Sequence, residues 1–258
     1  MRIVSYNVNG IRSALSKGLA DWIAQDNADV YCFQEIKAHE ADIPTPVFQA
    51  LGYHAYWFPA QKKGYSGVGI ISKSEPDAVH MGCGLDQADA EGRVIRARYG
   101  DLNVVNTYFP SGSSGDERQA YKMQFLDDYL RWMNNTFSIG KDRLLVAGDY
   151  NICHREIDIH DPKGNKDSSG FLPEERAWMD RFFSQGMVDT FRMLNPEPHQ
   201  YSWWSFRANA RNNNKGWRID YINASELLRG EIRGASLHPD ARHSDHCPVA
   251  LELESARG

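Results

Sequence analysis

The sequence predicts an α/β protein built as a four-layer sandwich, with two packed mixed β-sheets flanked by helices. Runs with the apolar patterns of strands alternate along the chain with stretches that have the periodicity of helices. This mixed layout occurs twice, over residues 1–140 and 141–258, which favours two sheets. Neither a Pro/Ser-rich linker nor a run of charge separates the halves. We therefore expect residues 1–258 to form a single domain.

Ten runs are predicted to be strands. Several alternate apolar with polar residues, the pattern of a half-buried strand. Residues 144–147 are continuously apolar, which is typical of a central strand covered on both faces. The ten runs are residues 2–8, 30–34, 54–58, 68–72, 94–99, 102–108, 144–148, 218–223, 231–237 and 249–253.

Three helices are predicted between these strands. Residues 15–25 and 117–137 repeat apolar side chains at helical spacing, and the second stretch begins with acidic residues that favour a helix N-terminus. Pro173, followed by Glu174 and Glu175, predicts the start of a third helix.

Composition and charge limit the function. Hydrophobic residues make up 41% and charged residues 24%, which excludes a disordered chain. A net charge of −5 counts against a generally basic nucleic-acid binder. Residues 203–218 nevertheless lack acidic residues and interleave basic with aromatic side chains, as phosphate contacts beside an apolar wall require. The alternative is a solvated Asn-rich loop between core aromatics. The side chains concerned are Trp203, Trp204, Phe206, Arg207, Arg211, Lys215, Trp217 and Arg218.

The cysteines and the N-terminus indicate a reducing compartment. The four cysteines are far apart and show no C-x-x-C spacing, so we expect free thiols in the cytosol. A strand is predicted from residue 2, which leaves no room for a signal peptide. No apolar stretch approaches the roughly 20 residues that a membrane-spanning helix needs.

Four polar clusters follow or precede predicted strands. Oxygen-rich side chains that meet at strand ends suit a hard divalent cation and a phosphate ester. Taken singly, each cluster is equally compatible with an ordinary turn, a helix cap or a surface carboxylate. Together they indicate a metal-dependent phosphodiesterase. The clusters are Asn7-Val8-Asn9, Gln34-Glu35, Asp149-Tyr150-Asn151 and Ser244-Asp245-His246.

Each cluster has a chemical interpretation. Glu35 and Asp245 come from distant strands and can share one Mg²⁺, which usually takes one or two carboxylates. Asn7 and Asn9 alternate after a strand and can offer an amide oxygen to a metal or an N–H to a phosphate. Asp149 can orient or deprotonate a water, and Asn151 can donate to the phosphorane oxygens; their shared face is set by the strand before them. These donors are expected to converge.

The histidines leave two alternatives open. Adjacent Ser244, Asp245 and His246 cannot form a Ser-His-Asp triad in a strand, because neighbours point to opposite faces. We expect Asp220 to pair with His246 and to favour the imidazolium, which suits an anionic phosphate. His238, His243 and His246 could instead bind zinc, although no thiolate or fourth ligand accompanies them. His154 precedes Arg155 and Glu156 and is expected to face solvent.

The motifs in this order resemble those of the exonuclease III-type apurinic/apyrimidinic (AP) endonucleases, within the endonuclease/exonuclease/phosphatase superfamily. The resemblance runs from Met1 almost to the final strand. It rests on residues 7–10, 34–37, 64–69, 91–94, 148–151, 216–221 and 244–246.

The resemblance implies roles for the reacting groups. Glu35, Asp245 and Asn7 would hold Mg²⁺, for which Mn²⁺ is the expected substitute, and Asp149 and Asn151 belong to the same group of metal-ligand candidates. Asp149 would activate the attacking water, and Asn151 would stabilise the transition state. The phenol of Tyr108 would lie beside the scissile phosphate, which His246 paired with Asp220 would bind.

The resemblance also implies a substrate. The partner would be double-stranded DNA containing an abasic site, cut on its 5′ side to leave a 3′-hydroxyl. Trp203, Trp217 and Ile219 would wall the pocket for the base-less sugar. The remaining substrate-binding residues would contact the DNA: Asn9, Lys37, Tyr65, Arg93 and Arg207.

Some expectations concern secondary properties. Ser111 stands where many relatives have an amide, and the loop of residues 111–115 is short and small. These departures bear on a secondary 3′→5′ exonuclease or 3′-phosphodiesterase activity. We expect a monomer without membrane contact in the cytoplasm, associated with the nucleoid if the source is bacterial.

Two other functions fit the same sandwich. A phosphatase or lipid phosphodiesterase would keep the polar clusters but would have no use for Trp203 and Trp217. A non-catalytic nucleic-acid-binding regulator should have lost catalytic residues, and none is missing here.

Overall fold

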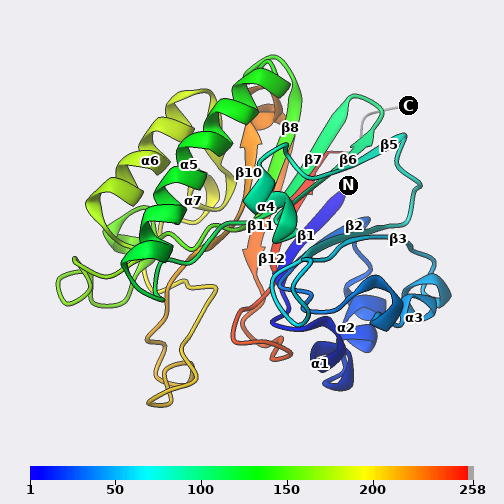
Figure 1. The fold of residues 1–258 in the computed structure, drawn as a ribbon, viewed down its shortest axis with the longest axis horizontal. Helices are drawn as coiled ribbons and strands as arrows, with labels where there is room; N and C mark the ends of the chain where they lie inside the picture. The colour runs from blue at the N-terminus through cyan, green and yellow to red at the C-terminus, as the bar shows by residue number, and fades with distance from the viewer. Residues whose placement is uncertain (255–258) are drawn as a thin grey trace.

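Two six-stranded mixed sheets form the centre of the molecule in the computed structural model, which describes residues 1–254 (Figure 1). The first sheet has the order β11-β12-β1-β2-β4-β3 and the second the order β5-β6-β7-β8-β10-β9. The strands of the first are β1 Arg2–Asn7, β2 Val30–Gln34, β3 His54–Phe58, β4 Val68–Ser72, β11 Ile232–Leu237 and β12 Val249–Leu253. Those of the second are β5 Ala78–Met81, β6 Val94–Tyr99, β7 Leu102–Tyr108, β8 Arg143–Asp149, β9 Met187–Asp189 and β10 Asp220–Ser225.

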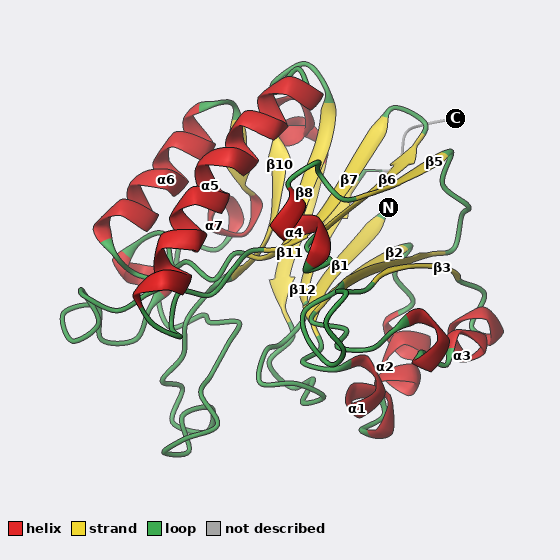
Figure 2. Cartoon of the chain, in the orientation of Figure 1, coloured by secondary structure: helices red, strands yellow, loops and turns green. Residues whose placement is uncertain are grey.

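Helices cover the outer faces of both sheets (Figure 2). On one side lie α1 Ile11–Ser16, α2 Leu19–Asp26 and α3 Thr45–Ala50, and on the other α5 Asp116–Thr136 and α6 Pro173–Ser184. Two short helices, α4 Asp86–Ala90 and α7 Thr190–Leu194, lie at the connections. Short 3₁₀ turns occupy Glu40–Asp42, Glu156–Asp158 and Glu226–Glu231.

Three apolar cores separate the four layers. Ile3, Val104 and Leu251 belong to the core between the two sheets. The neighbouring residues of β1, Val4 and Tyr6, belong instead to the core under α1, α2 and α3. This switch follows the alternation of side chains along a strand. A third core joins the second sheet to α5 and α6 through Phe125, Tyr129, Val146, Trp178 and Phe182. The predicted four-layer α/β sandwich is therefore confirmed.

The division of the chain into two halves does not match the sheets. Strands β5, β6 and β7 come from the first half of the chain but belong to the second sheet, and β11 and β12 return to the first. The reason is pairing: β12 lies antiparallel to β1, with Leu251 opposite Ile3. The two sheets therefore do not correspond to the two halves of the chain.

The predicted helix over residues 15–25 is two helices. It breaks at Gly18, whose φ of 93° is left-handed and incompatible with a continuing helix. Two strands went unpredicted, β5 and the three-residue β9; each lies at an edge of the second sheet. The predicted strand over residues 218–223 begins later, at Asp220.

Strand ends meet at one edge of the sandwich. In the first sheet β1 and β2 run parallel, with Asn7 opposite Gln34. In the second, β7 and β8 run parallel, with Tyr108 opposite Asp149. Asp220, at the start of the antiparallel β10, also lies opposite Asp149. Strand β1 contacts β8 across the core, so these ends lie together.

All four cysteines are buried, free thiols. Among residues 1–254 no helix combines the length and the apolarity needed to cross a membrane.

Replacing Gly69 with alanine is expected to destabilise the first sheet. A Cβ at this position of β4 would lie 2.3 Å from Cε3 of Trp57. That ring is 2% exposed and its Nε1 donates to Oγ1 of Thr45, so it has little freedom to move. We expect a loss of about 1–3 kcal/mol in the free energy of unfolding, measured by urea denaturation. Gly230→Ala is the control, because no atom lies within 4 Å of its added Cβ; equal stability losses would contradict the steric argument.

Candidate active site

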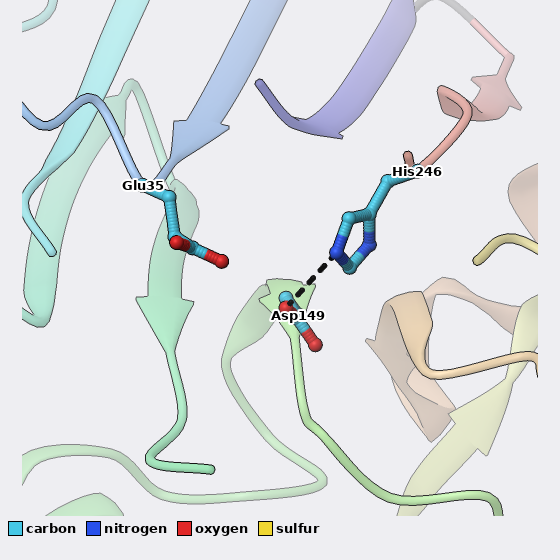
Figure 3. A group of neighbouring side chains, drawn as sticks. All are labelled: Glu35, Asp149 and His246. Carbon is cyan, nitrogen blue, oxygen red and sulfur yellow. Dashed lines mark ion pairs between the residues drawn. The ribbon is translucent and has the colours of Figure 1, made fainter. Parts of the chain in front are cut away.

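The site begins with three side chains from both sheets (Figure 3). Glu35 follows β2, Asp149 ends β8, and His246 precedes β12. One potential ligand atom of each lies within 4.8 Å of the others. Oxygen donors from two carboxylates, with an imidazole beside them, fit a divalent cation. In the described part of the chain, this is the group of acidic, cysteine or histidine side chains that satisfies that spacing.

Asn7 links the two carboxylates. Its Nδ2 donates to Oε1 of Glu35 and to Oδ2 of Asp149, each over 2.8 Å. Its Oδ1 accepts the backbone N–H of Asn9 over 3.0 Å. Asn7 is fully buried, and these two hydrogen bonds join a carboxylate that follows the first sheet to one that ends a strand of the second.

Lys37 supplies positive charge to the same cluster. Its Nζ lies 2.7 Å from Oε2 of Glu35 and donates to Oδ1 of Asn9 over 2.5 Å. Burial opposes ionisation of Glu35, but Lys37 and Asn7 outweigh it and lower the pKa of Glu35. Glu35 is therefore charged at neutral pH.

Several site residues have a left-handed backbone that non-glycine residues rarely adopt. The φ angles are 45° at Asn9, 50° at Glu35, 50° at Lys37 and 52° at Asn151. Such strained conformations tend to gather where a fold must aim functional side chains.

The predicted pair of His246 and Asp220 is present. Nδ1 of His246 lies 2.9 Å from Oδ2 of Asp220, and Nε2 lies 3.8 Å from Oδ2 of Asp149. Burial lowers the pKa of His246, but Asp220 and Asp149 outweigh it and raise that pKa above its usual range. Burial and the charge of Asp220 raise the pKa of Asp149, against the influence of His246. The imidazole is thus held cationic beside Asp149.

Asp245 lies outside the group of Glu35, Asp149 and His246. Its Oδ1 accepts from Nδ2 of Asn9 over 2.9 Å, and its Oδ2 accepts from Nε1 of Trp203 over 3.0 Å. Glu35 thus shares this group with Asp149 and His246, whereas its predicted partner Asp245 is not a member of it. Asp245 still lines the same pocket.

A cavity of about 340 Å³ opens beside these residues. Trp203, Trp217 and Ile219 line it, and the two indoles meet edge to face with centroids 6.0 Å apart. The polar part of the lining includes Glu35, Tyr108, Asp149, Asn151, Asp245 and His246. The three predicted apolar wall residues therefore share one cavity with these six predicted polar residues, whereas Asn7 and Asp220 lie outside its lining.

Tyr108 is held from behind by Arg93. The guanidinium lies over the Tyr108 ring, 4.9 Å from its centroid, and Nη1 donates to the Tyr108 carbonyl over 2.8 Å. Burial, with the charges of Glu35 and Asp149, raises the pKa of Tyr108 well above its usual range. The phenol therefore remains a proton donor at neutral pH.

Arg93 is buried, although it was expected to contact DNA at the surface. It is 1% exposed, and it also donates to Oε2 of Glu91 and to the hydroxyl of Tyr65. The buried guanidinium is not accessible to a DNA backbone, so the predicted direct contact is wrong. Its place is behind Tyr65 and Tyr108, which it orients.

The segment of residues 203–218 divides into two parts. Arg218 is fully buried, and Arg211 stacks on Trp204 at 4.7 Å while donating to the carbonyl of Ser244. Arg207 and Lys215 are exposed, and the Phe206 side chain is 76% exposed. The basic side chains therefore serve the fold in one part and form a free surface in the other.

The other histidines lie apart from the site. His243 contacts the hydroxyl of Tyr6, and His238 lies beside Arg2 and Ser236. Neither joins His246 in the potential metal group of the described residues. His154 is 6% exposed, and its Nε2 lies 2.7 Å from Oδ1 of Asp180 on α6, so the expectation that it faces solvent is wrong.

Sequence reasoning missed part of the cavity wall. Ser113, Ser169 and Gly170 line the cavity, together with Ser111. Their loops carry small polar residues without a chemical motif, so the only available signal was their Gly- and Ser-rich composition.

A buried ionic cluster anchors the segment that holds Trp217. Oδ1 of Asp158 accepts from Nε of Arg218 and from Nε of Arg192, each over 2.8 Å. Burial opposes ionisation of Asp158, but the two guanidinium groups outweigh it and lower its pKa. A carboxyl whose pKa is lower in the folded state stabilises the fold above its unfolded pKa of about 3.9. That stability is lost as the pH falls through the folded value.

Asp158→Asn is therefore expected to cost about 3–5 kcal/mol of unfolding free energy at pH 7, because it removes the buried carboxylate that Arg218 and Arg192 share and leaves Asp189 as the only carboxylate paired with Arg218 among the described residues. The difference from the parent protein should shrink as the pH falls below about 4, because the unfolded chain then takes up a proton at this carboxyl and the folded parent follows at its lower pKa. Urea denaturation of both proteins, at pH 7 and at a pH below about 4, measures the difference in their free energies of unfolding. Asp167→Asn, at an exposed carboxylate near Lys166, is the control. A pH-independent difference would contradict the ionic explanation.

Comparison with known proteins defines the class. Residues 4–246 match the model of the endonuclease/exonuclease/phosphatase family, and the chain belongs to this family. It is 40% identical to the exodeoxyribonuclease of Bacillus subtilis over 253 residues, covering 97% of this chain and 98% of that protein. It is 33% identical to exodeoxyribonuclease III of Haemophilus influenzae, covering 98% and 100%.

A solved structure agrees with these relatives. The AP endonuclease from Archaeoglobus fulgidus superposes with a TM-score of 0.92 at 29% identity, covering 99% of this chain and all of that one. The resemblance to exonuclease III-type AP endonucleases, and with it the predicted class of hydrolase, is confirmed.

Proposed function

We propose that this protein is a metal-dependent DNA repair endonuclease that hydrolyses the phosphodiester 5′ to an abasic site and leaves a 3′-hydroxyl. The observation that carries the proposal is the single cavity that joins the cluster of Glu35, Asp149 and His246 to the walls of Trp203 and Trp217. A phosphatase for small esters needs the first part but not the second. The names of the relatives, exodeoxyribonuclease and AP endonuclease, support DNA as the substrate.

Mg²⁺ is the proposed cofactor, with Mn²⁺ as a substitute. The carboxylates of Glu35 and Asp149 would hold it, and Asp245, Asn7 and Asn151 are the further candidates from the same edge. A bound divalent cation would neutralise charge on the phosphate during in-line attack.

The protein's own groups would perform the proton and charge work. Asp149, 1% exposed and with a raised pKa, is suited to orient and deprotonate the attacking water. His246, held as a cation by Asp220, would bind the phosphate oxygens. The phenol of Tyr108 and the amide of Asn151 would donate to charge that develops on the phosphorane. These four side chains line the cavity, and Asp220 lies behind His246.

The cavity would select for a missing base by shape. Trp203, Trp217 and Ile219 leave an apolar space in which a base-less sugar can lie, whereas an attached base would collide with the indoles. Extrusion of a nucleotide costs least where no base stacks or pairs. Outside the cavity, the exposed Arg207, the partly exposed Tyr65 and Lys37, and Asn9 would contact the DNA strands. We propose a cytoplasmic monomer.

The test is a duplex oligonucleotide with one tetrahydrofuran abasic analogue, incubated with Mg²⁺ or with EDTA. A single Mg²⁺-dependent nick on the 5′ side would support the endonuclease, because this analogue cannot undergo β-elimination. DNA binding without a nick would favour a non-catalytic regulator. Neither binding nor cleavage would point to small phosphate esters or lipids. A 3′-recessed duplex in the same assay measures the secondary 3′→5′ exonuclease activity.

Trp217→Ala is expected to weaken the discrimination between abasic and intact duplex. The indole forms one wall of the cavity and packs against Trp203, so its loss opens space for a base. We expect the preference to fall by a factor of roughly 5–30, the equivalent of about 1–2 kcal/mol. Cleavage rates on the two duplexes measure it. An unchanged preference would locate the selective contact elsewhere.

A further inference from the structure

A buried ion pair lies behind the cavity, and neither of its two residues lines the cavity. Nζ of Lys122 on α5 lies 2.6 Å from Oε1 of Glu175 on α6, and both side chains are fully buried. Replacing a buried ion pair by apolar side chains of similar volume is often neutral or stabilising. The stability of the fold therefore does not by itself account for this pair, and its other contacts become informative.

Lys122 reaches the backbone of Asn151. Its Nζ donates to the Asn151 carbonyl over 2.8 Å. Asn151 has the left-handed φ of 52°, and its Nδ2 donates to the carbonyl of Phe109 over 2.9 Å. The hydrogen bond from Lys122 thus fixes the backbone of a strained residue whose side chain faces the cavity.

Glu175 holds the part of the cavity wall that lies next to Asn151. Its Oε2 accepts the backbone N–H of Gly170 over 2.6 Å and that of Leu172 over 3.0 Å. Gly170 lines the cavity and packs closely against two other lining residues. A Cβ added to it would lie 3.0 Å from Cζ3 of Trp217 and 3.1 Å from the carbonyl oxygen of Asn151. Oε1 of Glu175 also accepts from Gln119, which in turn accepts the hydroxyl of Ser169.

We propose that Lys122 and Glu175 are positioning residues, which together set the place of Asn151 and of the Gly170 wall beneath Trp217. The inference rests on the proposed endonuclease function for its kinetic consequences. On this proposal the pair does more than link two helices. Lys122 positions Asn151, the proposed donor to the transition state, and Glu175 positions the wall of the proposed sugar pocket.

The main test is a double-mutant cycle between Lys122→Met and Asn151→Ala, measured by single-turnover nicking of the tetrahydrofuran duplex. Lys122→Met should lower the rate at saturating DNA at least tenfold in the parent and less than twofold when Asn151 is already alanine. The affinity for DNA should change less than threefold. Equal losses in both backgrounds would overturn the proposal for Lys122.

Folding is controlled with the double variant Lys122→Met/Glu175→Met, which removes both charges and keeps an apolar pair. The proposal expects it to match the parent in thermal unfolding yet remain at least tenfold slower. Parent-like rates in this variant would overturn the proposal. The matched control is Asp127→Asn, which removes an exposed ion pair to Arg181 between the same two helices and should change the rate less than twofold.

A second measurement does not depend on catalysis. Hydrogen exchange of the Gly170 amide should accelerate at least tenfold in Glu175→Met and in the double variant, but not in Asp127→Asn. If the parent protein fails to nick DNA while this exchange behaves as expected, the proposed function fails and the positioning role stands. Unchanged exchange at Gly170 would overturn the role of Glu175.

Discussion

Asp149→Asn is expected to lower the rate of strand cleavage by about 10²–10⁴-fold, the usual contribution of a positioned acid or base. The substitution keeps the shape of the side chain and one of its two acceptors, so that either Nδ2 of Asn7 or the backbone N–H of Asn151 still has an oxygen to which it can donate. It removes the negative charge that lies 3.8 Å from Nε2 of His246 and the group suited to accept a proton from water. Single-turnover nicking of the tetrahydrofuran duplex measures the loss.

DNA binding separates this chemical effect from a damaged fold. Asp149 is 1% exposed at the floor of the cavity, so its substitution should leave affinity for abasic duplex within about threefold in a gel-shift assay with EDTA. Asp180→Asn is the control, because it removes another carboxylate paired with a histidine, His154, outside the cavity. Turnover equal to that of the parent would exclude Asp149 as the base.

The strands and the polar clusters could be predicted because both leave strong local patterns. β2, β4 and β12 are almost entirely buried, and their apolar runs define them to the residue. Glu35 and Asp149 stand directly at the ends of such runs, where parallel strands place their side chains at one edge. Pattern and function coincide there.

The sheet to which a strand belongs could not be predicted, because it depends on pairing between distant segments. Strand β12 completes the first sheet by pairing with β1 from the other end of the chain. The edge strands β5 and β9 were missed because β5 is half-exposed and β9 has only three residues.

Buried charges were the other failure. Sequence alone suggests solvent or DNA for a charged side chain, but Arg93 is enclosed by its near neighbour Glu91 and by Tyr65 and Tyr108 from separate segments. Lys122 and Glu175 lie on helices, where charges usually face water, and only the packing of α5 against α6 buries them. Groups that orient other groups are therefore harder to find than groups that react.

Glu35→Ala is expected to raise the Mg²⁺ concentration needed for half-maximal cleavage by more than about tenfold. Substituting even a residue that only supports a metal ligand typically costs 10–100-fold in affinity or activity. Glu35 is one of two carboxylates in the potential metal group, and its low pKa keeps it charged whenever a cation is available. Cleavage rates over a Mg²⁺ titration give the half-maximal concentration.

DNA affinity should respond in the opposite direction to metal affinity. Loss of Glu35 leaves Nζ of Lys37 without the carboxylate that lies 2.7 Å away, so its charge is no longer neutralised and can attract a phosphate, although Asn9 still accepts from it. We therefore expect equal or tighter binding of abasic duplex in EDTA, together with weaker metal binding. Glu40→Ala, at an exposed carboxylate five residues further along the chain, should change neither quantity. An unchanged Mg²⁺ requirement in Glu35→Ala would remove Glu35 as a ligand, whereas weaker DNA binding would mean that Lys37 needs Glu35 to hold it in place for the substrate.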